Sequence, residues 1–180
     1  MRLLIAFALS ALLALPAFAR PLATDEMDTL GKAVDGYLAA IEKADAPAIV
    51  SALPPRILNV FAGATGTEAK KLEATLVDQT KAMMKDSRFR DLAYGRSQLV
   101  AEDAALADGT AVTWVLIPTA FVSETKSGKT KHEQPLLALN EGGDWYFLRI
   151  DGPQSQQLAA IAYPFLAEIE FPPSLASAVK

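Results

Sequence analysis

Apolar residues recur at two different spacings along the chain, which divides it into a helical part and a strand-rich part. From Thr24 to Ile41, apolar residues recur at intervals of three and four, which predicts an amphipathic helix that Thr24 can cap. A second, shorter helix is expected after Asp45, which suits a helix cap, and Pro54-Pro55 should end or kink it. A third helix is predicted over residues 67–85, with Thr67 as its cap.

Beyond Arg90 the apolar period shortens toward two, which is typical of half-buried β-strands. Four strands are then expected, joined as an antiparallel meander by three tight turns: Asp108-Gly109, Ser127-Gly128 and Glu141-Gly142-Gly143. Pro118 and Pro135 cannot donate hydrogen bonds to a ladder. We therefore expect each at a bulge, a bend or an unpaired edge, where it would bend the sheet.

The last hairpin, from Lys131 to Asp151, holds the only histidine and one of the two tryptophans. If the loop at residues 141–143 is three residues long, two cross-strand pairs follow: Leu139 with Trp145 and Leu137 with Phe147. Arg149 would then lie on the same side of the sheet near Glu133. The simpler interpretation of Arg149 is a cross-strand ion pair, and the alternative is a polar anchor for a carboxylate or phosphate group.

The end of the chain predicts one more helix. It should start near Pro153 with Leu158, Ile161 and Ala162 inward, and Pro164 should kink or stop it before a proline-containing tail. The whole pattern predicts an α+β fold in which N-terminal helices pack on one face of a curved four-stranded antiparallel meander, with a C-terminal helix. A bent sheet around a long helix leaves a conical space, which is either filled or open.

The first 19 residues are typical of a secretory signal peptide: Arg2, an apolar run to Leu15, Pro16 and a small-x-small site at 17–19. We therefore expect three segments. Residues 1–19 form the signal peptide, residues 20–152 the helix-plus-sheet domain, and residues 153–180 a C-terminal helix and tail packed on the same domain. Export to a periplasm, or otherwise secretion, is the expected localisation, with no transmembrane span after cleavage.

The composition excludes several kinds of site. The chain has no cysteine, so it has no disulfide, thiol nucleophile or cysteine-bound metal. Cleavage would remove Arg2 and leave 16 basic residues against 21 acidic ones, a net charge of about −5. An acidic surface argues against nucleic-acid binding. The three lysines from Lys126 to Lys131 are interpreted as a solvated turn, and no cofactor-binding motif is found.

The order of these elements resembles the nuclear transport factor 2-like, or cystatin-like, superfamily. The similarity rests on the early amphipathic helices, the strands "TAVTWVLIP" and "PLLALN", and the closing "GGDWYFLRI", and it covers roughly residues 24–152. Members of this superfamily have unrelated activities, and its enzymes present an Asp-His or Tyr-Asp pair to the cone; no such spacing stands out in this chain. The chain also resembles, in topology alone, periplasmic phospholipid-shuttle proteins.

Histidine is the side chain best suited to acid–base work near neutrality, so His132 is a candidate. Its neighbour Glu133 points to the opposite face of a strand, and we interpret His132 as an exposed strand-end residue. A metal site is disfavoured, because one histidine leaves only carboxylates and carbonyls as ligands.

The sequence therefore favours a non-enzymatic binding or interaction domain with an apolar or amphiphilic small ligand in the cone. The candidate ligand-binding residues are Arg149, Trp114, Tyr94, Phe147 and Met83. Two alternatives remain: a hydrolase or isomerase that uses His132 or a buried carboxylate, and a structural envelope protein that forms homodimers through the sheet face.

Overall fold

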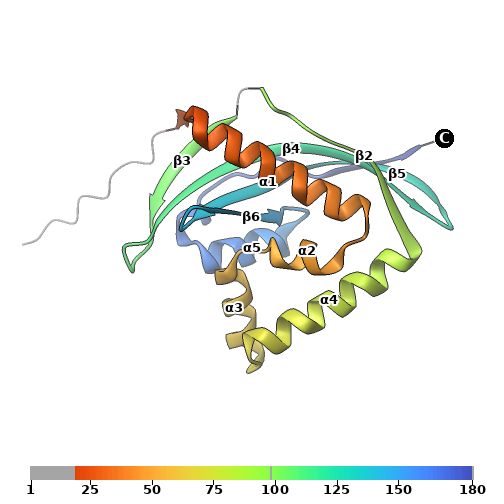
Figure 1. Ribbon diagram of the computed structural model, residues 1–180, viewed down its shortest axis with the longest axis horizontal. Coiled ribbons are helices and arrows are strands. Elements are labelled where there is room, and N and C mark those ends of the chain that lie inside the picture. The colour runs from red at the N-terminus through yellow and green to blue at the C-terminus, as the bar shows by residue number, and fades with distance from the viewer. Residues whose placement is uncertain (1–18, 98, 180) are drawn as a thin grey trace, which may run out of the picture.

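The computed structural model describes residues 19–97 and 99–179, so the predicted signal peptide lies outside the described residues except for Ala19. These residues form five α-helices, a short 3₁₀ helix and seven strands (Figure 1). In chain order the elements are β1 (Arg20–Pro21), α1 (Thr24–Glu42), α2 (Ala46–Ser51), α3 (Pro55–Thr65), α4 (Ala69–Asp86), β2 (Ser87–Tyr94), β3 (Val100–Ala105), β4 (Ala111–Thr125), β5 (Gly128–Glu141), β6 (Asp144–Arg149), α5 (Pro153–Ala162), η1 (Pro164–Leu166) and β7 (Leu175–Val179).

The fold is α+β with one antiparallel sheet, as predicted, but the prediction of four strands is wrong. The described sheet has seven strands in the order β1-β3-β4-β5-β6, with β2 also pairing with β4 and β7 with β5. The three predicted hairpins are present as β3–β4, β4–β5 and β5–β6. The first predicted strand is divided into β2 and β3 by the segment after Gly95, and β1 and β7 are short edge strands without a clear apolar alternation.

Two long strands, β4 and β5, form the axis of the sheet. Toward the Thr125 end they are flanked by β2 and β7, and toward the other end by β3 and β6. Pro118 of β4 lies opposite Pro135 of β5, between the positions where the outer partners of each strand change. A proline at either position removes no hydrogen bond to β2, β3, β6 or β7, because none of these strands pairs with Pro118 or Pro135.

Gly95 allows β2 to leave the sheet at this point. Its backbone N–H donates to the carbonyl oxygen of Pro118 at 2.9 Å. A Cβ added at Gly95 would lie 2.9 Å from Cγ of the Pro118 ring, closer than real Cβ atoms approach other atoms. Only glycine therefore fits the close approach of this backbone to the proline ring.

We expect Gly95→Ala to destabilise the protein by about 1–3 kcal/mol, because the rigid proline ring cannot move aside cheaply. The matched control is Gly36→Ala in α1, where an added Cβ meets nothing within 4 Å. The control should stabilise by about 0.5–1 kcal/mol, since alanine is the better helix former. Urea unfolding of both variants measures the difference, and equal stabilities would contradict the packing of Gly95 on Pro118.

The helix boundaries differ from the prediction at the caps. The N-cap of α1 is Ala23 and that of α4 is Glu68, so Thr24 and Thr67 are not the capping residues. The predicted cap of α2 is confirmed, because Oδ1 of Asp45 accepts a hydrogen bond from the Ala48 N–H at 3.1 Å. The Pro54-Pro55 pair does end the second helical element, but Pro55 also starts α3, which the sequence analysis missed.

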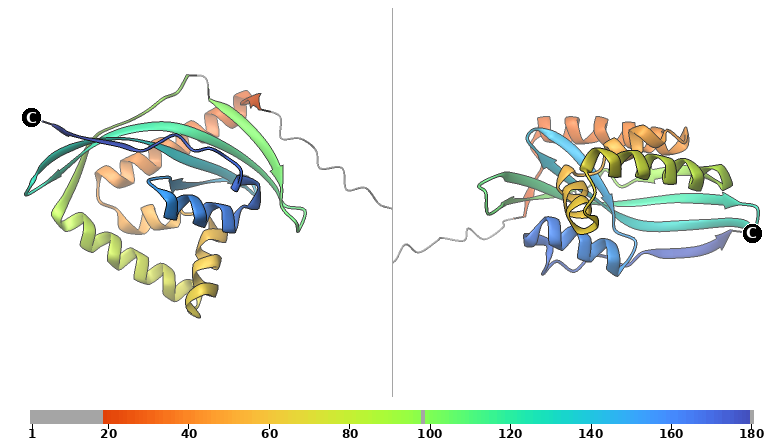
Figure 2. Two further views of the ribbon diagram at one scale, coloured as in Figure 1. Left: turned by 180° about the vertical axis from the view of Figure 1, so that it is seen from behind. Right: turned by 90° about the horizontal axis from the view of Figure 1, so that it is seen from below.

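The central strands carry apolar side chains on both faces. Val115 and Ile117 of β4 pack with α1, while Trp114 packs on the other face with residues of α3, α5 and η1. Successive strand residues point to opposite sides of a sheet, so this alternation gives two cores. Figure 2 shows α1 and α5 on opposite sides of the strands. Helices therefore cover both faces here, whereas one covered face was expected.

In α5 the buried residues are Ala159 and Ala162, whereas Ile161 is 57% exposed. The expectation that Ile161 faces inward is therefore wrong. Its neighbour Tyr163, just past the helix, fills this part of the core with no exposed surface.

Tyr163 also belongs to a polar network that ties α3 to the sheet. Its hydroxyl donates to Oε2 of Glu141 at 3.0 Å, and Oε1 of Glu141 pairs with Nε of Arg56 at 2.7 Å. Arg56 also pairs with Asp108 in the β3–β4 turn at 2.8 Å. One α3 side chain thus connects the β3–β4 turn to the end of β5, and Glu141 extends the network to the end of α5.

Helix α4 lies away from the central strands of the sheet (Figure 1). None of its 18 residues is buried, and it touches α2, α3 and the first part of β2. By contrast, α1 buries Leu30, Val34, Tyr37 and Ala40. Little apolar contact therefore holds α4 in place.

We expect the backbone amides of α4 to exchange with solvent deuterium faster than those of α1, since local opening is easiest where few apolar contacts are lost. Hydrogen exchange followed by mass spectrometry measures both helices in one experiment. Equal protection of α4 and α1 would show that α4 is held more firmly than its contacts indicate.

Candidate functional site

The β5–β6 turn sets the position of Arg149. The turn has two residues, Gly142 and Gly143, with φ angles of 69° and 96°, a conformation that favours glycine. Glu141 is paired within the ladder and is not part of the loop, so the predicted register is wrong by one residue. The observed pairs are Leu139 with Tyr146, Asn140 with Trp145 and Leu136 with Arg149.

Arg149 therefore lies beside Gln134 and not beside Glu133. Nη2 of Arg149 donates to Oε1 of Gln134 at 3.4 Å. Glu133 instead pairs with Lys131 on its own strand. The simpler interpretation of Arg149, an ion pair with Glu133, is thus wrong.

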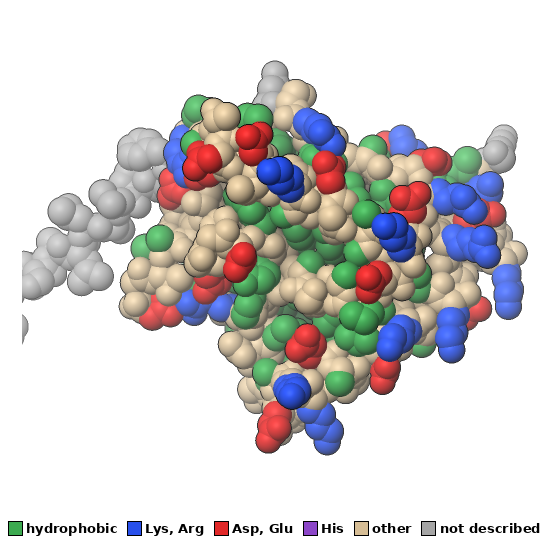
Figure 3. Space-filling view, in the orientation of Figure 1, with side chains coloured by type: hydrophobic (Ala, Val, Ile, Leu, Met, Phe, Trp, Pro, Cys, Tyr) green, Lys and Arg blue, Asp and Glu red, His purple; other side chains and the backbone are tan. Residues whose placement is uncertain are grey.

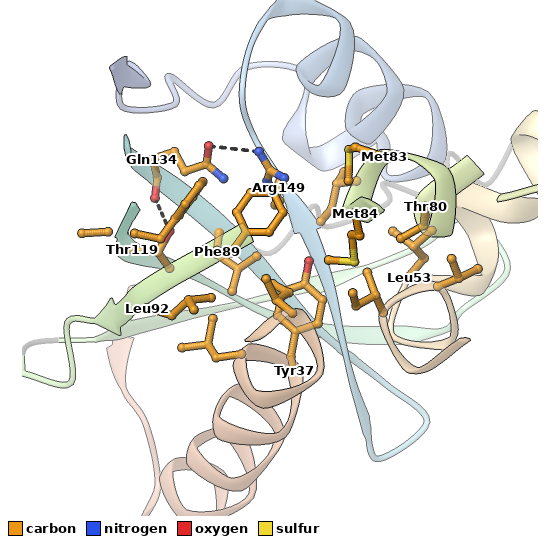
Figure 4. Close-up of a pocket in the computed structure, with 18 of the residues that line it drawn as sticks. Tyr37, Leu53, Thr80, Met83, Met84, Phe89, Leu92, Thr119, Gln134 and Arg149 are labelled. Carbon is orange, nitrogen blue, oxygen red and sulfur yellow. Dashed lines mark hydrogen bonds between the residues drawn. The ribbon is translucent and has the colours of Figure 1, made fainter. Parts of the chain in front are cut away.

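The space between the helices and the sheet is open. A cavity of about 220 Å³ lies between α1, α2, α4 and the strands β2, β4, β5 and β6 (Figure 4). Figure 3 shows apolar side chains in the hollow between α1 and α4. The lining residues are mostly apolar, and most belong to four groups: Tyr37, Leu38 and Ile41; Ile49, Val50 and Leu53; Leu76, Thr80, Met83 and Met84; Phe89, Leu92 and Phe121.

The five predicted ligand-binding residues do not come together at this cavity. Met83 and Arg149 line it, from α4 and β6. Phe147 lies in the core beneath, stacked on Tyr37 with ring centroids 5.0 Å apart. Trp114 lies on the other face of the sheet against Phe165, at 6.4 Å, and Tyr94 lies outside this cavity beneath the guanidinium of Arg96.

Arg149 is the one charged side chain among the residues that line the cavity. Its Nε is buried and has no hydrogen-bond partner among the described residues. The nearest carboxylate oxygen, Oδ2 of Asp151, lies 3.9 Å from Nη2, beyond hydrogen-bond distance. The guanidinium carbon lies 5.5 Å from the centre of the Phe121 ring, which gives a cation–π contact. The guanidinium thus lacks a strong acceptor within the described part of the chain.

Few other polar groups reach the cavity. Gln134 and Thr119 are both buried, and the Thr119 hydroxyl donates to the Gln134 carbonyl oxygen at 2.7 Å. Burial raises the pKa of Tyr37, and the nearby charge of Arg149 lowers it by a smaller amount. The Tyr37 hydroxyl points toward the Arg149 side of the cavity (Figure 4), and no hydrogen bond joins it to another described residue. Together with the guanidinium, the hydroxyls of Tyr37 and Thr80 and the side-chain amide nitrogen of Gln134 therefore have free hydrogen-bonding capacity there.

His132 is half-buried, so its interpretation as an exposed strand-end residue is wrong. Its ring stacks on Phe121, with centroids 4.8 Å apart, and Nε2 lies 2.8 Å from the Ser123 hydroxyl oxygen. Burial lowers its pKa, and the charge of Arg149 lowers it further. The structure places His132 next to the aromatic ring that Arg149 also contacts.

This shift predicts how stability depends on pH. The folded-state pKa of His132 lies below its ordinary value of 6.5, so the unfolded chain binds the proton more tightly. Stability from this group is complete above pH 6.5 and is lost as the pH falls through the folded-state pKa. We expect urea unfolding to show lower stability at about pH 5.5 than at about pH 7.5, and His132→Gln to reduce that difference. A His132→Gln profile as steep as the wild type would contradict the assignment.

Three site residues, Tyr37, Gln134 and Thr119, are not predicted from the sequence. Tyr37 lies within the amphipathic helix predicted from Thr24 to Ile41, and its hydroxyl is the available signal. Gln134 is a polar residue directly before an apolar run, which is the pattern of a buried strand that carries one polar group. Neither signal locates a cavity without the positions of α2 and α4.

Among residues 19–97 and 99–179, no group of three or more His, Asp or Glu side chains lies close enough to hold a metal ion. In the same part of the chain, no helix is long and apolar enough to cross a membrane. Comparisons of the chain with protein families, with curated proteins and with solved structures find no significant match.

Proposed function

We propose that this protein is an exported binding domain that holds a small apolar or amphiphilic molecule in the cavity between α1, α2, α4 and the sheet. The observation that carries the proposal is the cavity itself: about 220 Å³ of space with a mostly apolar lining. Ligand sites in proteins are mostly apolar clefts with a few polar groups that fix orientation. Arg149, Gln134 and Tyr37 are such groups in this cavity.

The size of the cavity favours a ligand with one chain or ring. An apolar cavity of about 150 Å³ is enough to bind benzene. At about 30 Å³ for each water-sized group, this cavity holds roughly seven such groups. A two-chain lipid has several times that bulk, so a single short alkyl chain or a small ring system fits better than a phospholipid.

The position of α4 supports binding of an incoming molecule. Leu76, Thr80 and Met83 of α4 line the cavity, although no residue of this helix is buried. A ligand in the cavity would cover these side chains and add the apolar contacts that α4 lacks. The binding proposal therefore accounts for a helix whose apolar stripe is left partly exposed.

Calorimetric titration with 1-octanol tests this proposal, because octanol carries no charge and its eight-carbon chain is close in size to the cavity. We expect saturable binding to the wild type and at least about tenfold weaker binding to Thr80→Phe, whose ring would occupy the cavity. Lys81→Phe is the matched control, since Lys81 lies on the same helix but does not line the cavity. Equal binding by both variants, or no binding by the wild type, would contradict the proposal.

A further inference from the structure

We infer that the ligand carries a carboxylate at the end of a single alkyl chain, and that Arg149 binds this carboxylate. This inference rests on the proposed function, because it names the chemical class of the molecule in the same cavity. The observation behind it is the guanidinium of Arg149: its Nε has no acceptor among the described residues, and its ion pair with Asp151 spans 3.9 Å, beyond hydrogen-bond distance.

The free groups of Arg149 lie along one edge of the guanidinium. Nε and Nη2 point their N–H bonds to the same side, and this edge matches the two oxygens of a carboxylate. Nε has no partner, and Nη2 has only the neutral Gln134 oxygen at 3.4 Å, near the limit for a hydrogen bond. A carboxylate that displaces the Gln134 oxygen would give both N–H groups a charged acceptor.

Charge complementarity favours an anion over a neutral head group. Arg149 is the one charged residue of the lining, and the surrounding side chains are largely hydrocarbon. A cation beside apolar groups is stabilised by a paired anion much more than by a neutral oxygen. A molecule with one negative charge therefore complements the site better than an alcohol of equal length.

A carboxylate also fits the single positive charge of the lining better than a phosphate does. The described site offers one cation, the Arg149 guanidinium, beside the neutral donors of Tyr37, Thr80 and Gln134. A phosphate monoester carries nearly two negative charges and three acceptor oxygens, and it would leave part of its charge unpaired in this apolar lining. A single cation neutralises the single charge of a carboxylate.

The alkyl chain would extend from Arg149 toward α4. Figure 4 shows Arg149 and Gln134 on one side of the cavity, with Met84, Thr80 and Leu53 on the other. The tail would then contact the methionine side chains, whose flexible thioethers adapt to chains of different shape. The cavity holds roughly seven water-sized groups, so chains of about six to eight carbons are expected.

Three eight-carbon probes test the inference by calorimetric titration: octanoate, 1-octanol and octyl phosphate. For the wild type we expect octanoate to bind at least about tenfold more tightly than octanol, as a charge-assisted hydrogen bond requires, and more tightly than octyl phosphate. In Arg149→Met this preference for octanoate over octanol should disappear. The matched control is Arg96→Met, an exposed arginine outside the cavity, which should keep the preference.

Two further variants make the test independent of whether Arg149→Met folds. Arg149→Lys keeps the charge but loses the planar pair of donors, so it should retain only part of the preference. Tyr37→Phe should weaken octanoate binding several-fold more than octanol binding if the hydroxyl donates to the carboxylate. Circular dichroism of each variant verifies the fold before titration.

The outcomes separate the inference from the proposed function. Equal affinities of the wild type for octanol and octanoate overturn the carboxylate assignment, and the binding proposal stands. Tightest binding of octyl phosphate also overturns it, in favour of a phosphate head group. Failure of octanol to bind contradicts the proposed function itself.

Discussion

Fourteen paired positions join β4 to β5, from Val112–Glu141 to Thr125–Gly128, and the other described strands apart from β1 each pair with one of these two. Different strands flank this ladder at its two ends: β2 and β7 near Thr125, and β3 and β6 at the other end. The changeover lies at the Pro118–Pro135 pair, where neither proline has an N–H to offer to an outer strand. Because β2 and β6 both line the cavity and each leaves or joins the ladder near this point, the cavity depends on where the ladder changes partners.

The cavity stays open because α4 is held at its ends. Its C-terminal end runs directly into β2, which pairs with β4, and its other end follows α3. Arg56 anchors α3 to Glu141 and Asp108. With its C-terminal end joined to β2 and its N-terminal end following the far end of α3, α4 leaves between its apolar stripe and the sheet a space that the chain itself does not fill. Cavity formation is thus a consequence of the connections on each side of α4.

The sequence predicted the local features well and the cavity poorly. The hairpins were predictable because Asp108-Gly109, Ser127-Gly128 and Gly142-Gly143 combine turn residues with glycine at positive φ. The register of the last hairpin was not, since Glu141 fits both a loop and a strand end. That single residue moves Arg149 from the expected neighbour Glu133 to Leu136 and Gln134.

Prolines and tail residues explain the remaining errors. Pro54-Pro55 does end the second helical element, but proline is also favoured in the first turn of a helix, and α3, which starts at Pro55, is not predicted. The residues of β7 are all exposed, so no apolar alternation marks them as a strand. Only its pairing with β5 defines it. Trp114 and Phe147 were expected in the cone because aromatic residues often line pockets, but both are needed to fill the two cores beside the sheet.

Arg149 links the stability of the protein to its proposed function. The Nε of Arg149 is buried without an acceptor, whereas another part of the same side chain is exposed to water. The unpaired N–H costs folding free energy, and the exposure of the guanidinium to water reduces that cost. A ligand that supplies the acceptor removes this cost and binds only the folded state, which raises the apparent stability by mass action. The same ligand would cover the exposed stripe of α4 and hold that helix more firmly. Arg149, whose Nε has no hydrogen-bond partner among the described residues, and α4, which has no buried residue, thus both line one cavity. A single bound molecule would stabilise both.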